Sequence, residues 1–188
     1  PLLAGDLAAA YVLGIQSRGV AACPKHFAAN SQETARMTSD SVVDERTLRE
    51  IYLTGFERVV RSADPWALMS SYNRVNGSYA NESAFLLATV LRGEWGFDGL
   101  VVSDWGGSND AAAAVAAGSA LEMPSPGFGS VREVLDALAS GRLSEADLDA
   151  RVEEIRRLAE RTAASGAAPA TDEAVQHGLA RRAAAESV

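Results

Sequence analysis

Reactive and aromatic side chains follow short apolar runs at several places in the chain. The clearest case is Asp104-Trp105, which comes directly after the apolar residues of GLVVSDWGG. A carboxylate can attack an electrophilic carbon or transfer a proton, and an adjacent indole offers an apolar face to a ligand. Similar polar or aromatic pairs close three further runs: Lys25-His26, Tyr72-Asn73 and Glu122-Met123. If these runs are neighbouring strands, the side chains meet in one site.

Each candidate also has a purely structural interpretation. An aspartate after a strand is more often a turn or cap residue than a catalyst. Ser108 and Asn109, however, are available to cap the helix predicted after Asp104. The aromatic candidates are compatible with an ordinary core, and Lys25-His26 is compatible with a solvated loop. The functional interpretation rests on the whole set of groups, because no single one of them is decisive.

Helical periodicity alternates with these apolar runs. Apolar residues recur at helical spacing within 7–15, 48–60, 86–91, 131–138 and 148–158, and the alanine-rich stretch 110–117 is also predicted to be helical. Asp44, Ser83 and Ser144 are the expected N-caps. Strands are predicted at 20–23, 66–71, 100–103 and 120–123. The chain therefore alternates short strands with longer helices.

This alternation requires crossover connections, which predict an α/β protein with a parallel sheet. No glycine-rich phosphate loop follows any predicted strand, so a nucleotide-binding doubly wound sheet is disfavoured. Polar strand ends instead favour a (β/α) barrel, in which the carboxyl ends of the strands share one mouth. A complete barrel needs about eight strands, and the sequence supplies four. The expected fold is a partial (β/α)8 TIM-type barrel.

Composition limits the partners. The 188 residues are 47% hydrophobic, which is enough apolar material for a globular core. A net charge of −8 without a basic cluster disfavours nucleic acid, and no apolar run reaches the roughly 18 residues of a membrane span. A single cysteine, Cys23, excludes an intrachain disulfide and leaves the compartment unknown. The spacing of two histidines and one cysteine predicts no metal site.

Five motifs occur in order: PKHFAANSQETAR, VDERTLREIYLTGFERVV, ALMSSYNRVNG, LLATVLRGEWGFDGLVVSDWGG and LEMP. Together they resemble the catalytic barrel of family 3 glycoside hydrolases, the β-glucosidase group. The resemblance covers nearly the whole chain. It implies cleavage of terminal β-D-glycosidic bonds in β-glucosides or related β-xylosides, by a retaining mechanism that needs no cofactor.

The resemblance also assigns roles to individual residues. It implies that Asp104 is the nucleophile that forms a covalent glycosyl-enzyme, and that Trp105 contacts the leaving-group side. Hydroxyls of the sugar in the cleaved position are expected to bind Lys25 and His26. The remaining residues that the resemblance places around this sugar are Arg36, Met69 and Tyr72.

A retaining glycosidase needs a second carboxyl group as acid and base. In the resembling glucosidases this group is a Glu on a second domain. Glu122 and Glu33 are the candidates within the chain. A related branch, the bacterial N-acetylhexosaminidases, carries an acid/base histidine in a loop similar to KHFPGHG. The chain reads KHFAANSQE, without the second histidine, so hexosaminidase chemistry is disfavoured. AGSALEMP also departs from the usual AGLDLEMP, with Ser119 and Ala120 at the changed positions.

These expectations give three segments: a partial barrel at 1–161, a linker at 162–176 and the start of a truncated α/β sandwich domain at 177–188. The sequence starts with Pro1, and we expect a fragment that lacks the N-terminal barrel half and is inactive alone. Two alternatives remain: a barrel lyase that uses Lys25 as a Schiff-base amine, and a non-catalytic carbohydrate-binding remnant. The alternating Arg and Glu residues between Arg151 and Arg161 predict a solvated helix face.

Overall fold

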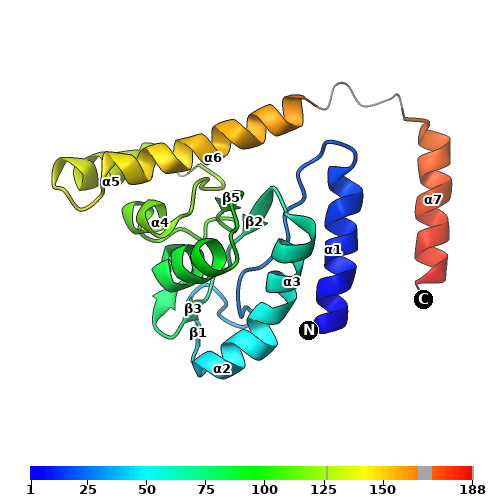
Figure 1. The fold of residues 1–188 in the computed structure, drawn as a ribbon, viewed down its shortest axis with the longest axis horizontal. Helices are drawn as coiled ribbons and strands as arrows, with labels where there is room; N and C mark the ends of the chain where they lie inside the picture. Colours follow the sequence, from blue (N-terminus) through cyan, green and yellow to red (C-terminus); the bar gives the residue numbers. More distant parts are fainter. Residues whose placement is uncertain (126, 165–170, 188) are drawn as a thin grey trace.

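The computed structural model describes residues 1–125, 127–164 and 171–187, which form an α/β fold rich in helix (Figure 1). The helices are α1 (Leu2–Gln16), α2 (Glu45–Thr47), α3 (Thr54–Ala63), α4 (Ala111–Ala117), α5 (Phe128–Ala139), α6 (Glu145–Ala163) and α7 (Glu173–Glu186). Two helical segments have wide π-type turns, η1 (Leu48–Leu53) and η3 (Phe85–Glu94), and η2 (Ala80–Glu82) is a 3-10 turn. The segments α2, η1 and α3 follow one another without a break, as the single predicted helix requires.

A parallel sheet lies at the centre of the fold. Its regular strands, β2 (Ala67–Met69) and β5 (Leu100–Val102), pair in parallel. Parallel bridges extend the sheet on both sides, from Phe27 to Ser70 and from Val102 to Leu121. The spatial order is therefore segment 22–27, β2, β5 and segment 120–121, which is also the order along the chain. This arrangement confirms the predicted α/β class with parallel crossovers.

The first predicted strand is displaced. It was expected at 20–23, but its bonding to β2 begins at Ala22, whose carbonyl accepts the N–H of Ala67 at 3.2 Å, and continues to Phe27, whose N–H donates to Met69 at 2.9 Å. Pro24 lies within this stretch and has no N–H, so the ladder is irregular. The polar residues that follow the apolar run therefore belong to the paired segment.

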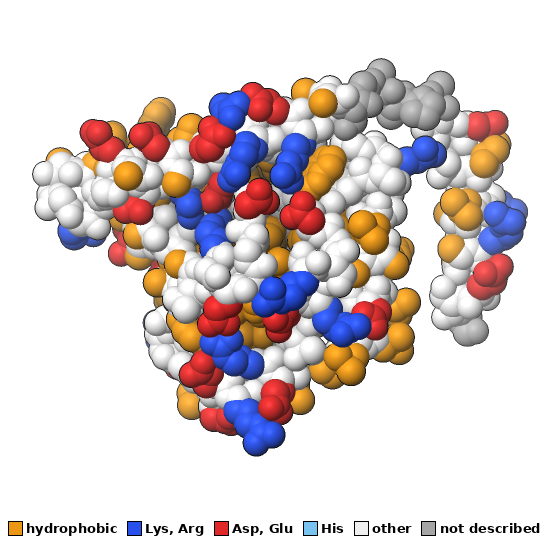
Figure 2. Space-filling model, viewed as in Figure 1, with side chains coloured by type: hydrophobic (Ala, Val, Ile, Leu, Met, Phe, Trp, Pro, Cys, Tyr) orange, Lys and Arg blue, Asp and Glu red, His pale blue; other side chains and the backbone are white. Residues whose placement is uncertain are grey.

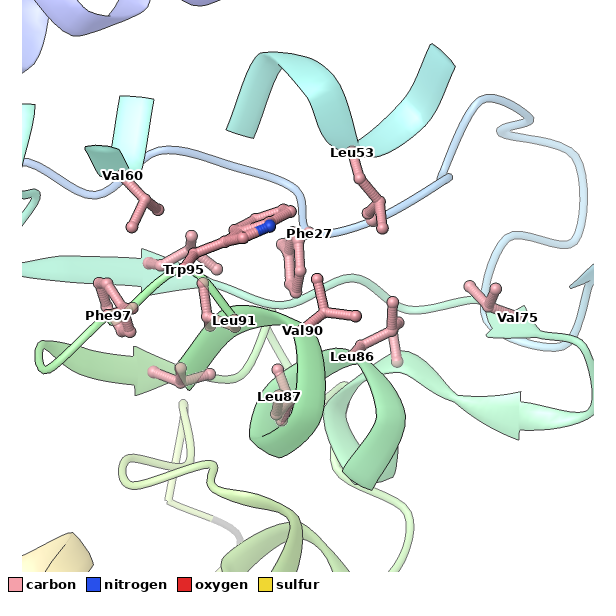
Figure 3. Packing of buried hydrophobic residues seen from close by; sticks show 14 of the residues in the cluster. Phe27, Leu53, Val60, Val75, Leu86, Leu87, Val90, Leu91, Trp95 and Phe97 are labelled. Atoms are coloured by element: carbon pink, nitrogen blue, oxygen red, sulfur yellow. The ribbon is translucent and has the colours of Figure 1, made fainter. Parts of the chain in front are cut away.

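Alternation along the strands separates two packing faces. Leu68 of β2 and Val101 of β5 are fully buried against the helices. Figure 3 shows how Phe27, Val90, Leu91 and Trp95 meet in this core. The opposite face of the same strands forms a smaller apolar cluster of Ala67, Met69, Leu100 and Val102. The main core thus lies on one face of the sheet, and the other face carries the smaller cluster, against which Leu158 of α6 (Glu145–Ala163) packs.

The helices α1 and α3 pack closely beside each other (Figure 1). Ala9 and Val12 of α1 contact the cluster that contains Val59 and Ala63 of α3. A Cβ on Gly5 would lie 3.0 Å from the carbonyl oxygen of Gly55, so a side chain at this crossing would push the helices apart. The small residues of α1 therefore serve helix packing.

A three-stranded sheet was not predicted. It contains β1 (Asp40–Ser41), β3 (Arg74–Val75) and β4 (Ser78–Tyr79), and β3 and β4 form an antiparallel hairpin. The turn residues Asn76 and Gly77 both have positive φ, 51° and 91°. Asn-Gly between two strands is the strongest short hairpin signal, and it is present in the motif RVNG.

The predicted helix starts are mostly confirmed. The side chains of Asp44 and Ser144 accept the N–H groups of residues three positions ahead, and Ser83 accepts the N–H of Leu86 at 3.3 Å. The alanine-rich helix expected at 110–117 agrees with α4, but its expected caps are wrong, because neither Ser108 nor Asn109 caps it. Asp110 is the N-cap, since its Oδ1 accepts the N–H of Ala113 at 2.8 Å.

Charged side chains of both signs are intermixed on the face shown in Figure 2. On α6 the exposed pair Arg156 and Glu153 fits the expected solvated face. Glu154 does not, because it is only 5% exposed. Its carboxylate forms ion pairs with Nη2 of Arg92 at 2.8 Å and Nη2 of Arg151 at 2.9 Å. One acidic position of the alternating pattern therefore points inward, where it joins α6 to η3.

The predicted linker, 162–176, lies partly outside the described residues. On either side of that gap, α6 extends to Ala163 and α7 begins at Glu173, and every described residue from 171 to 187 is exposed. The domain boundaries therefore stay predictions. Within the part of the chain that the structure describes, no helix is both long and apolar enough to cross a membrane.

Candidate active site

Asp104 follows the last residues of β5 and is almost fully buried, with 8% of its surface exposed. Its Oδ1 accepts the N–H of Trp105 at 2.7 Å, which fixes the orientation of the carboxylate. Its Oδ2 is buried and has no hydrogen bond within the described residues. A buried carboxylate oxygen without a hydrogen bond is unusual, and it leaves one lone-pair-bearing atom available for chemistry.

His26 is the nearest basic group to that atom. Its Nε2 lies 3.4 Å from Oδ2 of Asp104. The parallel register brings the two together, because Phe27 bridges to Ser70 and the N–H of Ser70 donates to Val102 at 2.9 Å. The segments that carry His26 and Asp104 therefore both lead to the carboxyl-terminal end of the parallel sheet.

Tyr72 and Arg36 complete a polar cluster around Asp104. The Tyr72 hydroxyl donates to the carbonyl of Trp105 at 2.9 Å, and the Arg36 guanidinium lies 4.7 Å from the centre of the phenol ring. Burial of the phenol, followed by the negative charge of Asp104, raises the pKa of Tyr72. The hydroxyl therefore stays protonated and remains a hydrogen-bond donor over a wide pH range.

The other predicted site residues differ in their surroundings. Trp105 is 63% exposed, so its indole is accessible beside the buried carboxylate. Met69 is half-buried against the small apolar cluster on the same face of the sheet. Lys25 is exposed and lines a hollow of about 330 Å³ together with Ile51 and Phe56. The described contacts thus gather His26, Arg36, Tyr72 and Trp105 around Asp104, whereas Lys25 borders a separate hollow.

The two alternative acids within the chain have other surroundings. Glu33 accepts a hydrogen bond from Arg36 at 2.9 Å. Glu122 lines a hollow of about 320 Å³ with Val131 and Leu135, next to α5. Neither arrangement supports the transfer of a proton to a group bound at Asp104.

Sequence reasoning missed Ser103 as a supporting residue. Its hydroxyl accepts the N–H of Met123 at 2.9 Å and lies 3.3 Å from the carbonyl of the same residue. The N–H of Gly106 donates to that carbonyl as well, at 2.8 Å. These bonds attach the backbone on both sides of Asp104 to the neighbouring segment. The signal in the sequence was a serine at the end of an otherwise apolar strand.

No metal site emerges within the described ranges, since they contain no group of three or more His, Cys, Asp or Glu side chains placed to hold an ion. The candidate site is therefore a carboxylate, an imidazole, a guanidinium and two aromatic rings. Such a set suits a neutral polyhydroxylated ligand and nucleophilic chemistry at the carboxylate.

Comparison with known proteins identifies the family. Residues 1–158 match the N-terminal domain of glycosyl hydrolase family 3. The chain belongs to this family. It is 48% identical over 189 aligned residues to thermostable β-glucosidase B of Acetivibrio thermocellus, covering 100% of this chain and 25% of that protein. The chain is also similar to an exo-α-(1→6)-L-arabinopyranosidase of Bifidobacterium longum, 45% identical over 88% of this chain and 22% of that enzyme.

Solved family 3 structures share the fold. The β-glucosidase 3B of Thermotoga neapolitana in complex with glucose superposes with a TM-score of 0.83 at 45% identity, over 86% of this chain and 24% of that one. A family 3 β-glucosidase of Bifidobacterium adolescentis gives 0.90 at 40% identity, over 98% and 27%. The chain therefore spans about a quarter of the length of these glycoside hydrolases, and the resemblance predicted from the motifs is confirmed.

Proposed function

We propose that the protein containing this chain hydrolyses terminal β-D-glycosidic bonds with retention of configuration, and that Asp104 is its nucleophile. The observation that carries the proposal is the buried Oδ2 of Asp104, which has no hydrogen bond within the described residues and lies 3.4 Å from His26 Nε2. Membership of glycoside hydrolase family 3 supplies the reaction class.

The geometry divides the carboxylate into an anchored oxygen and a reacting one. Oδ1 is held by the Trp105 N–H, so Oδ2 is the atom that attacks the anomeric carbon. The bond to the leaving oxygen breaks as the bond to Oδ2 forms, and a second carboxyl group protonates the leaving oxygen. Water then attacks the covalent glycosyl-enzyme with the help of the same group acting as base, and the acylal bond to Asp104 breaks.

The surrounding residues bind the sugar. His26 and Arg36 donate hydrogen bonds to its hydroxyls, and Met69 and Tyr72 shape the wall of the subsite. Trp105 offers its exposed ring to the leaving group, since an indole packs well on the apolar face of a pyranose. Lys25 would bind a hydroxyl only if its side chain turns from the hollow it now borders towards Asp104.

The acid and base group lies outside this chain. Glu33 is engaged with Arg36 and Glu122 borders the hollow next to α5, so we assign this role to a Glu of a further domain, as the family resemblance implies. The isolated chain is then inactive. A Schiff-base lyase gains no support, because Lys25 is exposed and such a lysine needs an apolar, water-poor pocket.

The chain is one half of a (β/α)8 barrel in this proposal. The four parallel segments follow in chain order, and among the described residues segments 22–27 and 120–121 pair on one side only. Next to the first of these edges, α1 exposes Leu3, Leu7 and Tyr11, which are 72%, 60% and 76% accessible. A preceding barrel half would cover this apolar face.

The proposal also divides the C-terminal part of the chain. Residues 162–176 form a linker, and residues 177–188 begin an α/β sandwich domain.

Covalent labelling of the full-length protein tests the nucleophile. A 2-deoxy-2-fluoro-β-glucoside slows both steps, but an activated leaving group such as dinitrophenolate keeps the first step fast, so a sugar adduct should accumulate on the peptide that contains Asp104. Peptide mass mapping locates the adduct. Labelling of another carboxylate would reject the assignment of Asp104. β-Glucoside, β-xyloside and α-L-arabinopyranoside substrates compared side by side would then assign the sugar, because relatives of more than one specificity exist.

A further inference from the structure

The loop between β5 and α4 carries Trp105, and a carboxylate from another segment of the chain accepts hydrogen bonds from its backbone. Two successive backbone N–H groups, those of Asn109 and Asp110, donate to the same Oε1 of Glu82 at 2.8 and 2.9 Å. Glu82 is the last residue of η2, which follows the β3–β4 hairpin. A charged acceptor that serves two neighbouring N–H groups fixes the local backbone more firmly than a neutral one.

The residue before Glu82 extends this contact into the core. Asn81 is completely buried, and its Oδ1 accepts the hydroxyl of Ser70 at 2.8 Å. Its Nδ2 lies 3.4 Å from Oγ of Ser108. The η2 segment therefore contacts three consecutive residues of the loop, 108–110, and is itself tied to the end of β2.

The opposite end of the same loop is held by groups near Asp104. Tyr72 donates to the carbonyl of Trp105, and Gly106 donates to Met123. Trp105 thus lies on a loop that is fastened at both ends, although Trp105 itself is 63% exposed. The fixed backbone limits the directions in which the indole can point.

Helix α4 does not require Glu82 as a cap. Asp110 already accepts the N–H of Ala113 at 2.8 Å, and Glu133 of α5 accepts the N–H of Ala111 at 3.2 Å. Glu82 and Glu133 thus approach the same helix start, but only Glu82 reaches the loop residue Asn109. This difference separates a role in the loop from a role in helix stability.

We propose that Glu82 is a positioning residue that holds the Asn109 end of the loop and thereby keeps Trp105 aligned as a platform for the leaving group. The inference rests on the proposed glycosidase function and deepens it. It predicts that loss of the Glu82 carboxylate lowers kcat/KM more for substrates with a larger leaving group. A β-linked disaccharide needs the platform, whereas glucosyl fluoride has a leaving group too small to contact it.

The test uses the full-length protein and three variants: Glu82→Ala, Glu82→Gln and Glu133→Ala. Active sites are counted with the 2-deoxy-2-fluoro glucoside, and kcat/KM is measured for a β-linked glucose disaccharide and for glucosyl fluoride. Glu82→Ala should lower the disaccharide-to-fluoride ratio of kcat/KM about tenfold. Glu82→Gln keeps an oxygen acceptor and should restore most of the ratio, and Glu133→Ala should leave it unchanged.

A Glu82→Ala variant with an unchanged ratio, or a Glu133→Ala variant with the same loss, would overturn the inference. Hydrogen exchange of peptides covering 104–110 gives a readout that does not need activity: exchange should accelerate in Glu82→Ala and stay slow in Glu133→Ala. Equal exchange in these two variants would also overturn it. A wild-type protein without glycosidase activity would reject the proposed function, and the exchange result would still decide whether Glu82 holds the loop.

Discussion

The imidazole of His26 and the carboxylate of Asp104 lie 3.4 Å apart, measured from Nε2 to Oδ2, although they come from different strands of the parallel sheet. The imidazole is partly exposed while the carboxylate is nearly buried. The imidazole is therefore the more accessible member of this pair, which stands at the centre of the candidate site.

Removal of the Asp104 carboxylate should abolish most of the activity of the full-length protein. Asp104→Ala is expected to lower kcat by on the order of 10³-fold or more, because the covalent intermediate cannot form. Asp98→Ala is the matched control: Asp98 precedes the same strand, is half exposed and lies near Arg157. Initial rates with an aryl β-glucoside make the comparison, and an Asp104→Ala protein of nearly wild-type rate would exclude the nucleophile role.

Loss of the His26 imidazole should weaken substrate binding and catalysis without unfolding the protein. His26→Ala is expected to lower kcat/KM about 10- to 100-fold, the range of one hydrogen bond to a charged or reacting group. The other histidine, His177, lies on the fully exposed α7, and His177→Ala should change nothing. Similar values for both variants in steady-state kinetics would contradict the arrangement at the site.

Tyr72 should titrate later than an ordinary tyrosine. Burial and the charge of Asp104 raise its pKa above 10.0, so the folded state retains the proton that the unfolded state loses. Its contribution to stability is fully present below about pH 10 and declines as pH rises through the folded pKa. Ultraviolet titration should show a late phenolate component that disappears in Tyr72→Phe. The exposed Tyr11 gives the control, since Tyr11→Phe should leave that component in place.

The buried Glu154 should be far more important for stability than its neighbour. Burial raises the pKa of Glu154 in spite of the nearby Arg92 and Arg151. Glu154→Ala leaves both guanidinium groups without this carboxylate and should cost about 3–5 kcal/mol. Glu153→Ala removes only an exposed pair with Arg156 and should leave the stability nearly unchanged, because solvent screens such pairs.

Thermal unfolding of the full-length protein and the two glutamate variants measures this difference. The midpoint should fall clearly for Glu154→Ala and stay near the wild-type value for Glu153→Ala. Equal midpoints for the two variants would mean that Glu154 does not hold α6 to η3 as its contacts with Arg92 and Arg151 indicate.

Most helices and the order of the strands could be predicted, because their signals are local. The caps at Asp44 and Ser144 act within three residues, and the apolar periods extend over a few turns. Prediction failed where three local signals compete: Ser108, Asn109 and Asp110 are all good caps, and only the position of the first helical turn selects Asp110. The hairpin at Asn76-Gly77 has a clear local signal, because this dipeptide favours the positive φ values that the turn requires.

Motifs and periodicity are properties of the chain, so they indicated the family, the alternation of strand and helix, and the position of Asp104 after an apolar strand. The contacts between distant side chains became known from the fold. It placed His26 against Asp104, turned Glu154 inward, left Lys25 at a separate hollow and brought Glu82 to the loop of Trp105. The physical reason is that these contacts depend on the register between distant segments, and burial in that register, not residue type, sets the partner of each charge.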